Sequence, residues 1–136
     1  MQKKYFFFDI DGTLSIGQTM VMPESAVRCL TRLRAEGHFT ALATGRLQAS
    51  AAGFAAAHGF ADFVADGGYS LTLGGQIAEM KSLPVQECIA LIERLEAAEI
   101  PWSVTPVNER MCVTSDARYL PFATPEYFPT QLDPTF

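Results

Sequence analysis

A short apolar run near the N-terminus, from Tyr5 to Ile10, most constrains how this chain can fold. The run is rich in aromatic residues and leads into an Asp11-Gly12 pair. Both of its faces are apolar, which is typical of a central strand in a parallel sheet. Because parallel strands need crossover connections, and these usually carry helices, such a strand predicts an α/β fold.

The segment that follows shows the alternation that an α/β fold needs. A helix is predicted from Pro23 to Gly37, because apolar residues recur there at helical spacing and glycine can end the helix. The next predicted elements are a strand over 38–43, an alanine-rich helix over 46–58 and a brief strand over 62–65. The order β-α-β-α-β implies right-handed crossovers and a parallel sheet.

The pattern changes after this βαβ region. Gly74 and Gly75 separate two short runs, which predicts a β-hairpin over 69–80. An amphipathic helix is predicted from Pro84 to Ala98, and we expect its apolar stripe, Val85 to Leu95, to pack in a core.

The C-terminal part carries weaker signals. Two antiparallel strands are predicted over 102–105 and 110–114, on either side of a Pro-Val-Asn-Glu turn. Trp102 is expected in the core. The proline-rich segment from Tyr119 onward shows no periodicity, so we expect it to be irregular.

Composition excludes several classes of protein. The 136 residues are 49% hydrophobic and carry a net charge of −5, which argues against disorder and against a nucleic-acid partner. No apolar stretch approaches the ~20 residues of a membrane span, so no membrane partner is expected. Three widely spaced cysteines without a CxxC pair are expected to be buried free thiols in a cytoplasmic protein. They are Cys29, Cys88 and Cys112.

The most informative chemistry follows the first predicted strand. Ligands of parallel α/β sheets bind beyond the carboxyl ends of the strands. Asp9 and Asp11 stand there two residues apart, so their side chains can share one face. Carboxylates this close repel each other unless a proton or cation lies between them, and Mg²⁺ prefers such oxygen ligands. Gly12 permits a sharp exit that keeps the backbone near a bound group.

A second cluster of candidate residues follows the second predicted strand. Thr44, Gly45 and Arg46 would supply a hydroxyl and backbone N–H groups at a helix N-terminus, where phosphate groups bind readily. Together with the aspartates they would form a phosphoryl-transfer site. Two alternatives remain open: Thr44 could be a helix N-cap, and Arg46 could be a plain surface residue.

At these two strings the sequence resembles the haloacid dehalogenase (HAD) superfamily of phosphohydrolases. The D-x-D-G-T-L string at Asp9–Leu14 matches the first motif of that superfamily. The Ala43–Arg46 string matches the second motif in the form used by the Cof-type (type IIB) branch, and Val64–Tyr69 resembles the segment before the cap of that branch. The resemblance implies the N-terminal half of a Rossmann-like parallel sheet over 1–81 and the beginning of an α+β cap over 82–136.

The resemblance also implies roles for individual residues. Asp9 would be the nucleophile that becomes an aspartyl-phosphate, and Asp11 the acid and base; both would hold Mg²⁺. The implied substrate-binding residues are Gly12, Thr44, Gly45 and Arg46. The substrate would be a small phosphorylated metabolite, such as a sugar phosphate. One departure is Asp66, where the branch commonly has asparagine.

Two motifs of the family have no counterpart in this sequence. They are a lysine beyond the cap segment and a downstream acidic cluster after Gly-Asp. The chain is therefore expected to end within the cap, with impaired activity. The first strand would then become a sheet edge, through which self-association is expected. Two alternatives are a non-catalytic remnant that binds phosphate or metal weakly, and a receiver-type domain with Asp66 as phospho-acceptor.

Overall fold

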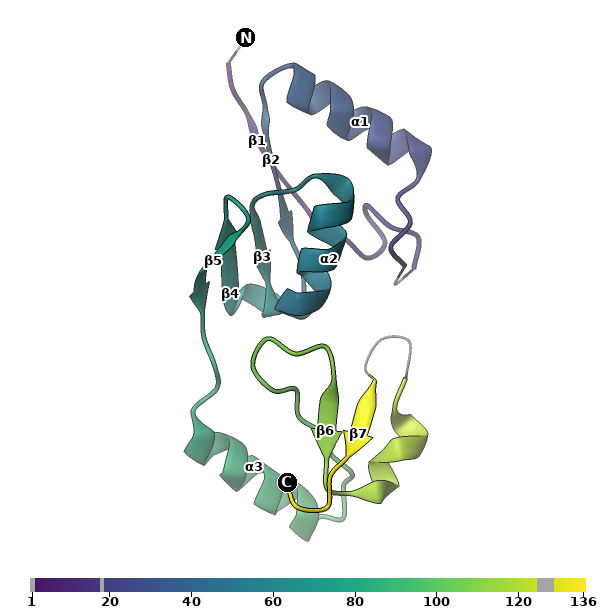
Figure 1. The fold of residues 1–136 in the computed structure, drawn as a ribbon, viewed down its shortest axis with the longest axis vertical. Coiled ribbons are helices and arrows are strands. Elements are labelled where there is room, and N and C mark those ends of the chain that lie inside the picture. The colour runs from purple at the N-terminus through teal and green to yellow at the C-terminus, as the bar shows by residue number, and fades with distance from the viewer. Residues whose placement is uncertain (1, 18, 125–128) are drawn as a thin grey trace. The chain divides into compact units, whose positions relative to one another are not determined.

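The computed structural model describes residues 2–17, 19–124 and 129–136. They form two compact units, Met1–Lys81 and Ser82–Phe136. Figure 1 shows the elements of both units. None of the helices among the described residues is long and apolar enough to cross a membrane.

The first unit is a five-stranded sheet with two helices, in the strand order β1-β2-β3-β4-β5. Strands β1, β2 and β3 are parallel, and β4 and β5 form an antiparallel hairpin beside β3. The predicted α/β fold with a parallel sheet is thus confirmed, as is the hairpin. The elements are β1 (Tyr5–Phe8), α1 (Glu24–Ala35), β2 (Phe39–Ala43), α2 (Gln48–His58), β3 (Phe63–Ala65), the 3-10 helix η1 (Asp66–Gly68), β4 (Ser70–Leu73) and β5 (Gln76–Met80).

Among the described residues, β1 is an edge strand that pairs with β2. Its side chains alternate: Tyr5 and Phe7 are exposed, whereas Phe6 and Phe8 are half-buried. The strand ends at Phe8, two residues earlier than predicted, because the chain enters a tight turn at Ile10. The strand is therefore apolar on both faces, as the sequence pattern indicates, but the face that carries Tyr5 and Phe7 is exposed to solvent.

The core of this unit lies between the sheet and the two helices. Because β1, β2 and β3 follow one another in sheet order, right-handed crossovers place α1 and α2 on the same face (Figure 1). Phe54 of α2 is fully buried there, as expected for a core aromatic residue. The buried cluster comprises Ile10, Leu14, Met22, Leu30, Leu42, Ala51, Phe54, Ala55, Phe60, Phe63 and Ala65.

Arg34 ties the C-terminal end of α1 to that of α2. Its Nη1 donates to the His58 carbonyl (3.1 Å), its Nε donates to Oγ1 of Thr40 (3.1 Å), and its guanidinium lies over the Phe60 ring. A cation at the C-terminus of a helix also interacts favourably with the helix dipole. Burial lowers the pKa of Arg34 from its ordinary value.

The second unit departs more from expectation. It contains α3 (Val85–Ala97), β6 (Cys112–Thr114), the 3-10 helix η2 (Ala117–Phe122) and β7 (Thr130–Leu132). The predicted strand over 102–105 is reduced to a single antiparallel bridge between Val104 and Val113. The tail is not irregular throughout, because β7 pairs with β6 in parallel. Residues 125–128 of the predicted irregular tail lie outside the described residues.

The 3-10 helix η2 begins with a side-chain cap, which the periodicity of the sequence does not indicate. Asp116 accepts a hydrogen bond from the backbone N–H of Arg118 (2.9 Å) and pairs with its guanidinium. Hydrogen bonds from Arg118 hold the pKa of Asp116 below its usual range. This local cap explains why a segment without periodicity still forms an ordered turn.

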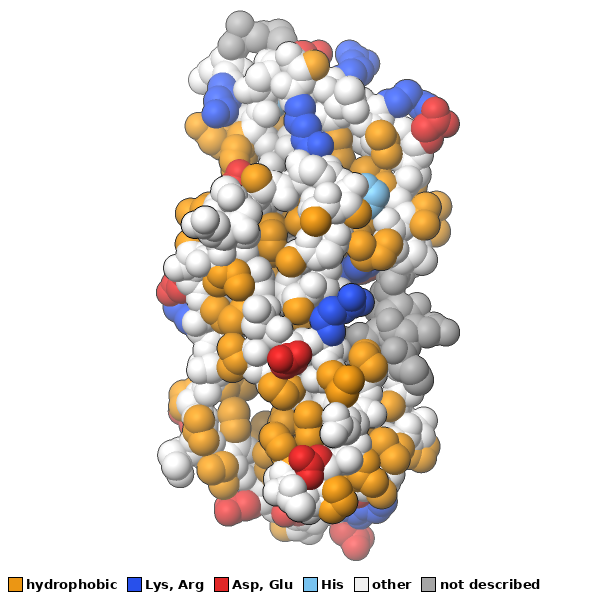
Figure 2. Space-filling model, viewed as in Figure 1, with side chains coloured by type: hydrophobic (Ala, Val, Ile, Leu, Met, Phe, Trp, Pro, Cys, Tyr) orange, Lys and Arg blue, Asp and Glu red, His pale blue; other side chains and the backbone are white. Residues whose placement is uncertain are grey.

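The apolar stripe of α3 does not pack in a core as predicted. No residue of this helix is buried: Val85 and Ile89 of the stripe are exposed, and its other members, Cys88, Ile92 and Leu95, are half-buried. Apolar side chains reach the surface of each unit (Figure 2). The physical reason is that amphipathicity fixes which face of a helix is apolar, whereas burial also requires a partner surface. Trp102 is buried, as predicted.

The three cysteines are free, as predicted, but they do not share one environment. Cys112 is buried, Cys88 is half-buried and Cys29 is exposed. The expectation of buried thiols is therefore wrong for Cys29. It lies on α1, where Leu30 is the buried residue of the helix, so the neighbouring position faces solvent.

Leucine truncation on two strands tests the position of the core. Leu42 on β2 is fully buried, and Leu73 on β4 is 52% exposed. We expect Leu42→Ala to lower the free energy of unfolding by about 2–5 kcal/mol, because it leaves a cavity. The matched change Leu73→Ala should cost less than about 1 kcal/mol. Urea denaturation followed by circular dichroism measures both, and equal losses would contradict this core.

Candidate active site

A tight turn after β1 positions the two aspartates. The buried carbonyl of Ile10 accepts hydrogen bonds from the backbone N–H groups of Leu14 (3.0 Å) and Ser15 (2.8 Å). Gly12 has a φ of 77°, which a residue with a side chain rarely adopts. The register of β1 on β2 pairs Phe8 with Leu42, so the residues that follow the two strands lie side by side.

A bidentate ion pair joins the two predicted strings. Arg46 donates from Nε to Oδ2 of Asp11 (2.9 Å) and from Nη2 to Oδ1 (2.6 Å). The side chain of Arg46 is 12% exposed and that of Asp11 33% exposed. Fork-to-fork pairs of this kind are the stronger and more directional salt bridges. Arg46 is therefore not a plain surface residue.

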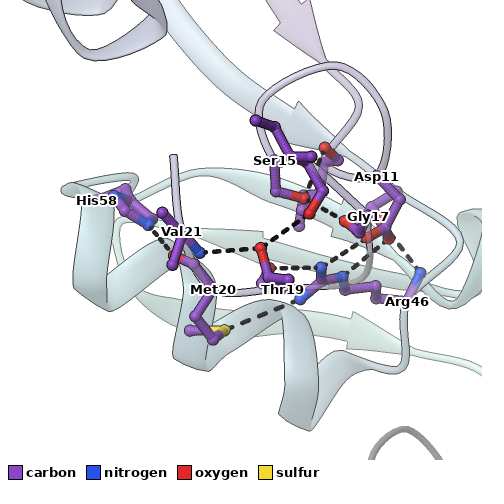
Figure 3. A network of polar contacts seen from close by, with 11 residues as sticks. Asp11, Ser15, Gly17, Thr19, Met20, Val21, Arg46 and His58 are labelled. Carbon is purple, nitrogen blue, oxygen red and sulfur yellow. Dashed lines mark hydrogen bonds and ion pairs between the residues drawn. The ribbon is translucent and has the colours of Figure 1, made fainter. Parts of the chain in front are cut away.

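Arg46 also holds the loop that follows the turn (Figure 3). Its Nη2 donates to the carbonyl of Thr19 (3.0 Å), and Nε2 of His58 lies 2.8 Å from the carbonyl of Met20. Earlier in the loop, Oγ of Ser15 donates to the carbonyl of Gly17 (2.9 Å). The side chains of Arg46, just before α2, and His58, at its end, thus hold the loop by hydrogen bonds to its backbone.

Asp9 has a different environment from Asp11. It is exposed, and its carboxylate makes no hydrogen bond or ion pair with any described residue. The predicted repulsion between the two carboxylates is relieved by Arg46, which neutralises Asp11 and leaves Asp9 free. One free carboxylate at the carboxyl edge of a parallel sheet is the arrangement that a ligand or ion could use.

The candidate site offers few side chains that could bind a metal ion. No group of three or more His, Cys, Asp or Glu side chains in the described part of the chain could hold a metal ion. Mg²⁺ usually keeps several waters and binds through one or two carboxylates together with substrate phosphate. The free carboxylate of Asp9 fits that smaller requirement.

Thr44 and Gly45 take different positions from those of a helix cap. Helix α2 begins at Gln48 with Leu47 as its N-cap, so Thr44 is not the cap residue. Its buried hydroxyl accepts a hydrogen bond from the backbone N–H of Arg46 (3.1 Å). Gly45 is exposed, and its N–H has no partner among the described residues.

Asp66 and Gln48 support this segment, a role that the sequence did not indicate for either residue. The N–H of Asp66 donates to the carbonyl of Arg46 (2.8 Å), and its Oδ1 accepts from the N–H of Gln48 (3.2 Å). The buried amide of Gln48 bonds to the hydroxyls of Ser70 and Thr72 on β4. Asp66 therefore acts as a cap for α2 from another element, which no local sequence signal reveals.

A family comparison identifies the class of protein that this fold and site define. The family model of the haloacid dehalogenase-like hydrolases matches residues 6–131. The chain belongs to that family. No curated protein matches it.

Solved structures of similar fold agree with the family. A protein from Geobacillus kaustophilus has a TM-score of 0.78 at 24% identity, over 100% of this chain and 53% of that chain. The sugar phosphatase BT4131, of HAD subclass IIB, has a TM-score of 0.71 at 21% identity, over 96% and 53%. The phosphatase BT1666 from Bacteroides thetaiotaomicron has a TM-score of 0.75 at 20% identity, over 98% and 50%. The chain spans about half the length of these proteins.

Removal of the Arg46 guanidinium tests whether its contacts with Asp11 and Thr19 hold the loop in place. We expect Arg46→Met to cost about 1–3 kcal/mol of unfolding free energy, because it removes charged hydrogen bonds to Asp11 and one to Thr19. Amide hydrogen exchange over residues 12–22 should become at least about fivefold faster. The control, Arg32→Met, lies on the exposed face of α1 and should change neither. Unchanged exchange in Arg46→Met would show that the contacts of Arg46 do not hold this loop.

Substitution of Asp66 tests its role as a cap. Asp66 has a φ of 52°, and its carboxylate accepts the N–H of Gln48. We expect Asp66→Ala to lower the free energy of unfolding by about 0.5–2 kcal/mol. Asp66→Asn keeps the acceptor and tolerates this backbone conformation, so it should cost less than about 0.5 kcal/mol. Urea denaturation distinguishes the two, and an equal loss in both variants would exclude the cap.

Proposed function

We propose that this chain carries part of the active site of a Mg²⁺-dependent phosphatase that hydrolyses small phosphorylated metabolites. The observation that carries the proposal is the environment of Asp9. Its carboxylate is exposed at the carboxyl end of β1, unengaged by any described residue, beside an Asp11 that Arg46 holds. A nucleophile must be accessible, and a proton-transfer group must be positioned next to it.

Asp9 and Asp11 divide the chemistry between them in this proposal. A carboxylate oxygen of Asp9 attacks phosphorus, and the bond to the ester oxygen breaks as that oxygen takes a proton from Asp11. Asp11 then removes a proton from water, which attacks the aspartyl-phosphate and releases inorganic phosphate and Asp9. A bound phosphate group would compete with Asp11 for the Arg46 guanidinium, and the released carboxylate would take up from solvent the proton that it then gives to the ester oxygen.

The remaining residues would hold the phosphate group. The hydroxyl of Thr44 and the N–H of Gly45 lie at the same edge of the sheet as the aspartates. The N–H of Gly12 already donates to the Ser15 carbonyl (3.0 Å), so Gly12 would contribute through the sharp turn that keeps the backbone near the phosphate. Mg²⁺, held by Asp9 and the carbonyl of Asp11, would offset the negative charge that gathers there when phosphate binds.

In this proposal the two compact units have different roles, one as core and one as cap. We assign 1–81 to the N-terminal half of a Cof-type (type IIB) core and 82–136 to a partial α+β cap, which sets the substrate in this proposal. Sugar phosphates are the favoured substrate class, since BT4131 is a sugar phosphatase of subclass IIB. The cytoplasmic location stays a prediction from the sequence.

One observation favours a second candidate function, a non-catalytic chain that binds phosphate or metal weakly. The carboxylate of Asp11 is already paired with Arg46, and no cluster of three acidic or other ligating side chains exists among the described residues. The receiver-type alternative is less favoured, because the carboxylate of Asp66 is engaged in capping α2.

Phosphatase activity of the purified 136-residue chain tests the proposal. We expect Mg²⁺-dependent hydrolysis of p-nitrophenyl phosphate, and a loss of at least about 100-fold in Asp9→Asn, which cannot form the aspartyl-phosphate. The control is Glu79→Gln, an exposed acid on β5, which should keep full activity. Turnover that survives Asp9→Asn would exclude the assigned nucleophile. Absence of turnover in the unmodified chain would favour the non-catalytic candidate.

A further inference from the structure

Polar side chains occupy core positions between helix α2 and strand β4. The buried residues of α2 share one face of the helix, and they are Gln48, Ala51, Phe54 and Ala55. The two inward positions of β4 are taken by Ser70 and Thr72. Gln48 is 3% exposed, and both hydroxyl residues are 2% exposed. Because a buried polar group is costly unless it is hydrogen-bonded, these three side chains depend on one another.

Both ends of the Gln48 amide are hydrogen-bonded to β4. Its Nε2 donates to Oγ1 of Thr72 (2.7 Å), and its Oε1 accepts from Oγ of Ser70 (2.8 Å). Two bonds to opposite ends of one planar amide fix the place of the side chain and also the way it is turned. Apolar contacts are non-directional, so they would hold the helix on the sheet without setting its rotation. A satisfied buried network can therefore specify one arrangement of two elements.

The backbone of Gln48 connects this network to the candidate phosphate-binding string, Thr44–Arg46. The N–H of Gln48 donates to Oδ1 of Asp66 (3.2 Å), and the N–H of Asp66 donates to the carbonyl of Arg46 (2.8 Å). The N–H of Gly67 donates to the carbonyl of Thr44 (3.4 Å). These residues of η1 lead directly into β4. Gln48 thus closes a ring of contacts between the start of α2, η1 and β4, and the string lies within that ring.

Gln48 has no direct part in binding a ligand, because its amide is buried and engaged with β4. Any effect on the site passes through the backbone, since the string ends two residues before it. That string carries the buried hydroxyl of Thr44 and the free N–H of Gly45, and its last residue holds Asp11. A misplacement of about 1 Å at a reacting centre can cost about 100-fold in rate, so the position of the string matters.

We propose that Gln48 is a positioning residue for phosphate binding. Its amide fixes the start of α2 against β4, and this sets the positions of the Thr44 hydroxyl and the Gly45 N–H. The inference rests on the proposed function and adds to it a residue outside both sequence strings. All the residues concerned belong to the first compact unit. Apolar side chains of similar shape would stabilise this core about equally well, so the network serves geometry.

Combined substitutions separate positioning from stability. Gln48→Met keeps the length of the side chain but leaves two buried hydroxyls without their partner, so it should lower the urea midpoint. The triple variant with Ser70→Ala and Thr72→Val removes those hydroxyls and should regain most of the lost stability. Calorimetric titration with inorganic phosphate and Mg²⁺ should nevertheless give a dissociation constant at least about fivefold higher for the triple variant than for the unmodified chain.

Amide hydrogen exchange reports on the string without any ligand. In the triple variant the N–H groups of Arg46 and Asp66 should exchange at least about tenfold faster, because the start of α2 is no longer fixed. The N–H of Leu42, which donates to the carbonyl of Asp62 within the sheet, should exchange as before. The matched control is Gln76→Met on the exposed part of β5, which should change neither exchange nor phosphate binding.

Thr72→Val alone keeps the test decisive if the triple variant does not fold. This change conserves the shape of the side chain and breaks one of the two bonds, so it should speed the same exchange at least about threefold. An unmodified chain that binds no phosphate would overturn the proposed function. Phosphate binding that is equal in the unmodified chain and the triple variant would overturn the role of Gln48 alone. Unchanged exchange at Arg46 and Asp66 would overturn that role whether or not phosphate binds.

Discussion

The ion pair between Arg46 and Asp11 is the contact on which the candidate site depends. It joins the turn after β1 to the segment after β2, and the same guanidinium reaches the carbonyl of Thr19. Thr44 and Asp66 in turn hold the backbone of Arg46 at its N–H and at its carbonyl. The position of one side chain therefore sets the relation between three segments that are distant in the sequence.

This contact also makes two similar residues different. Asp9 and Asp11 are the same residue type in the same turn, yet one carboxylate is free and the other is paired. A free carboxylate can attack phosphorus or bind a cation, whereas a paired one must be released from its partner before it can transfer a proton. Division of labour between two acids usually comes from their environments, and here the difference comes from a single arginine.

The sequence predicts what depends on local patterns. The strands, the helices and the hairpin of the first unit follow from apolar runs, periodicity and glycine turns, and the two strings at Asp9 and Thr44 lie at adjacent strand ends as expected. The Asp11–Arg46 pair could not be predicted, because it depends on how side chains turn after the strands have paired. The same holds for Asp66, which caps α2 from beyond β3.

Burial was the least predictable property. The stripe on α3 has the periodicity of a core helix, but its exposure depends on what lies against it. The tail lacks periodicity, yet β7 pairs with β6, because three residues of ladder need no long pattern. At β1 the aromatic run correctly indicates a strand, while its edge position follows from the sheet order of the described residues.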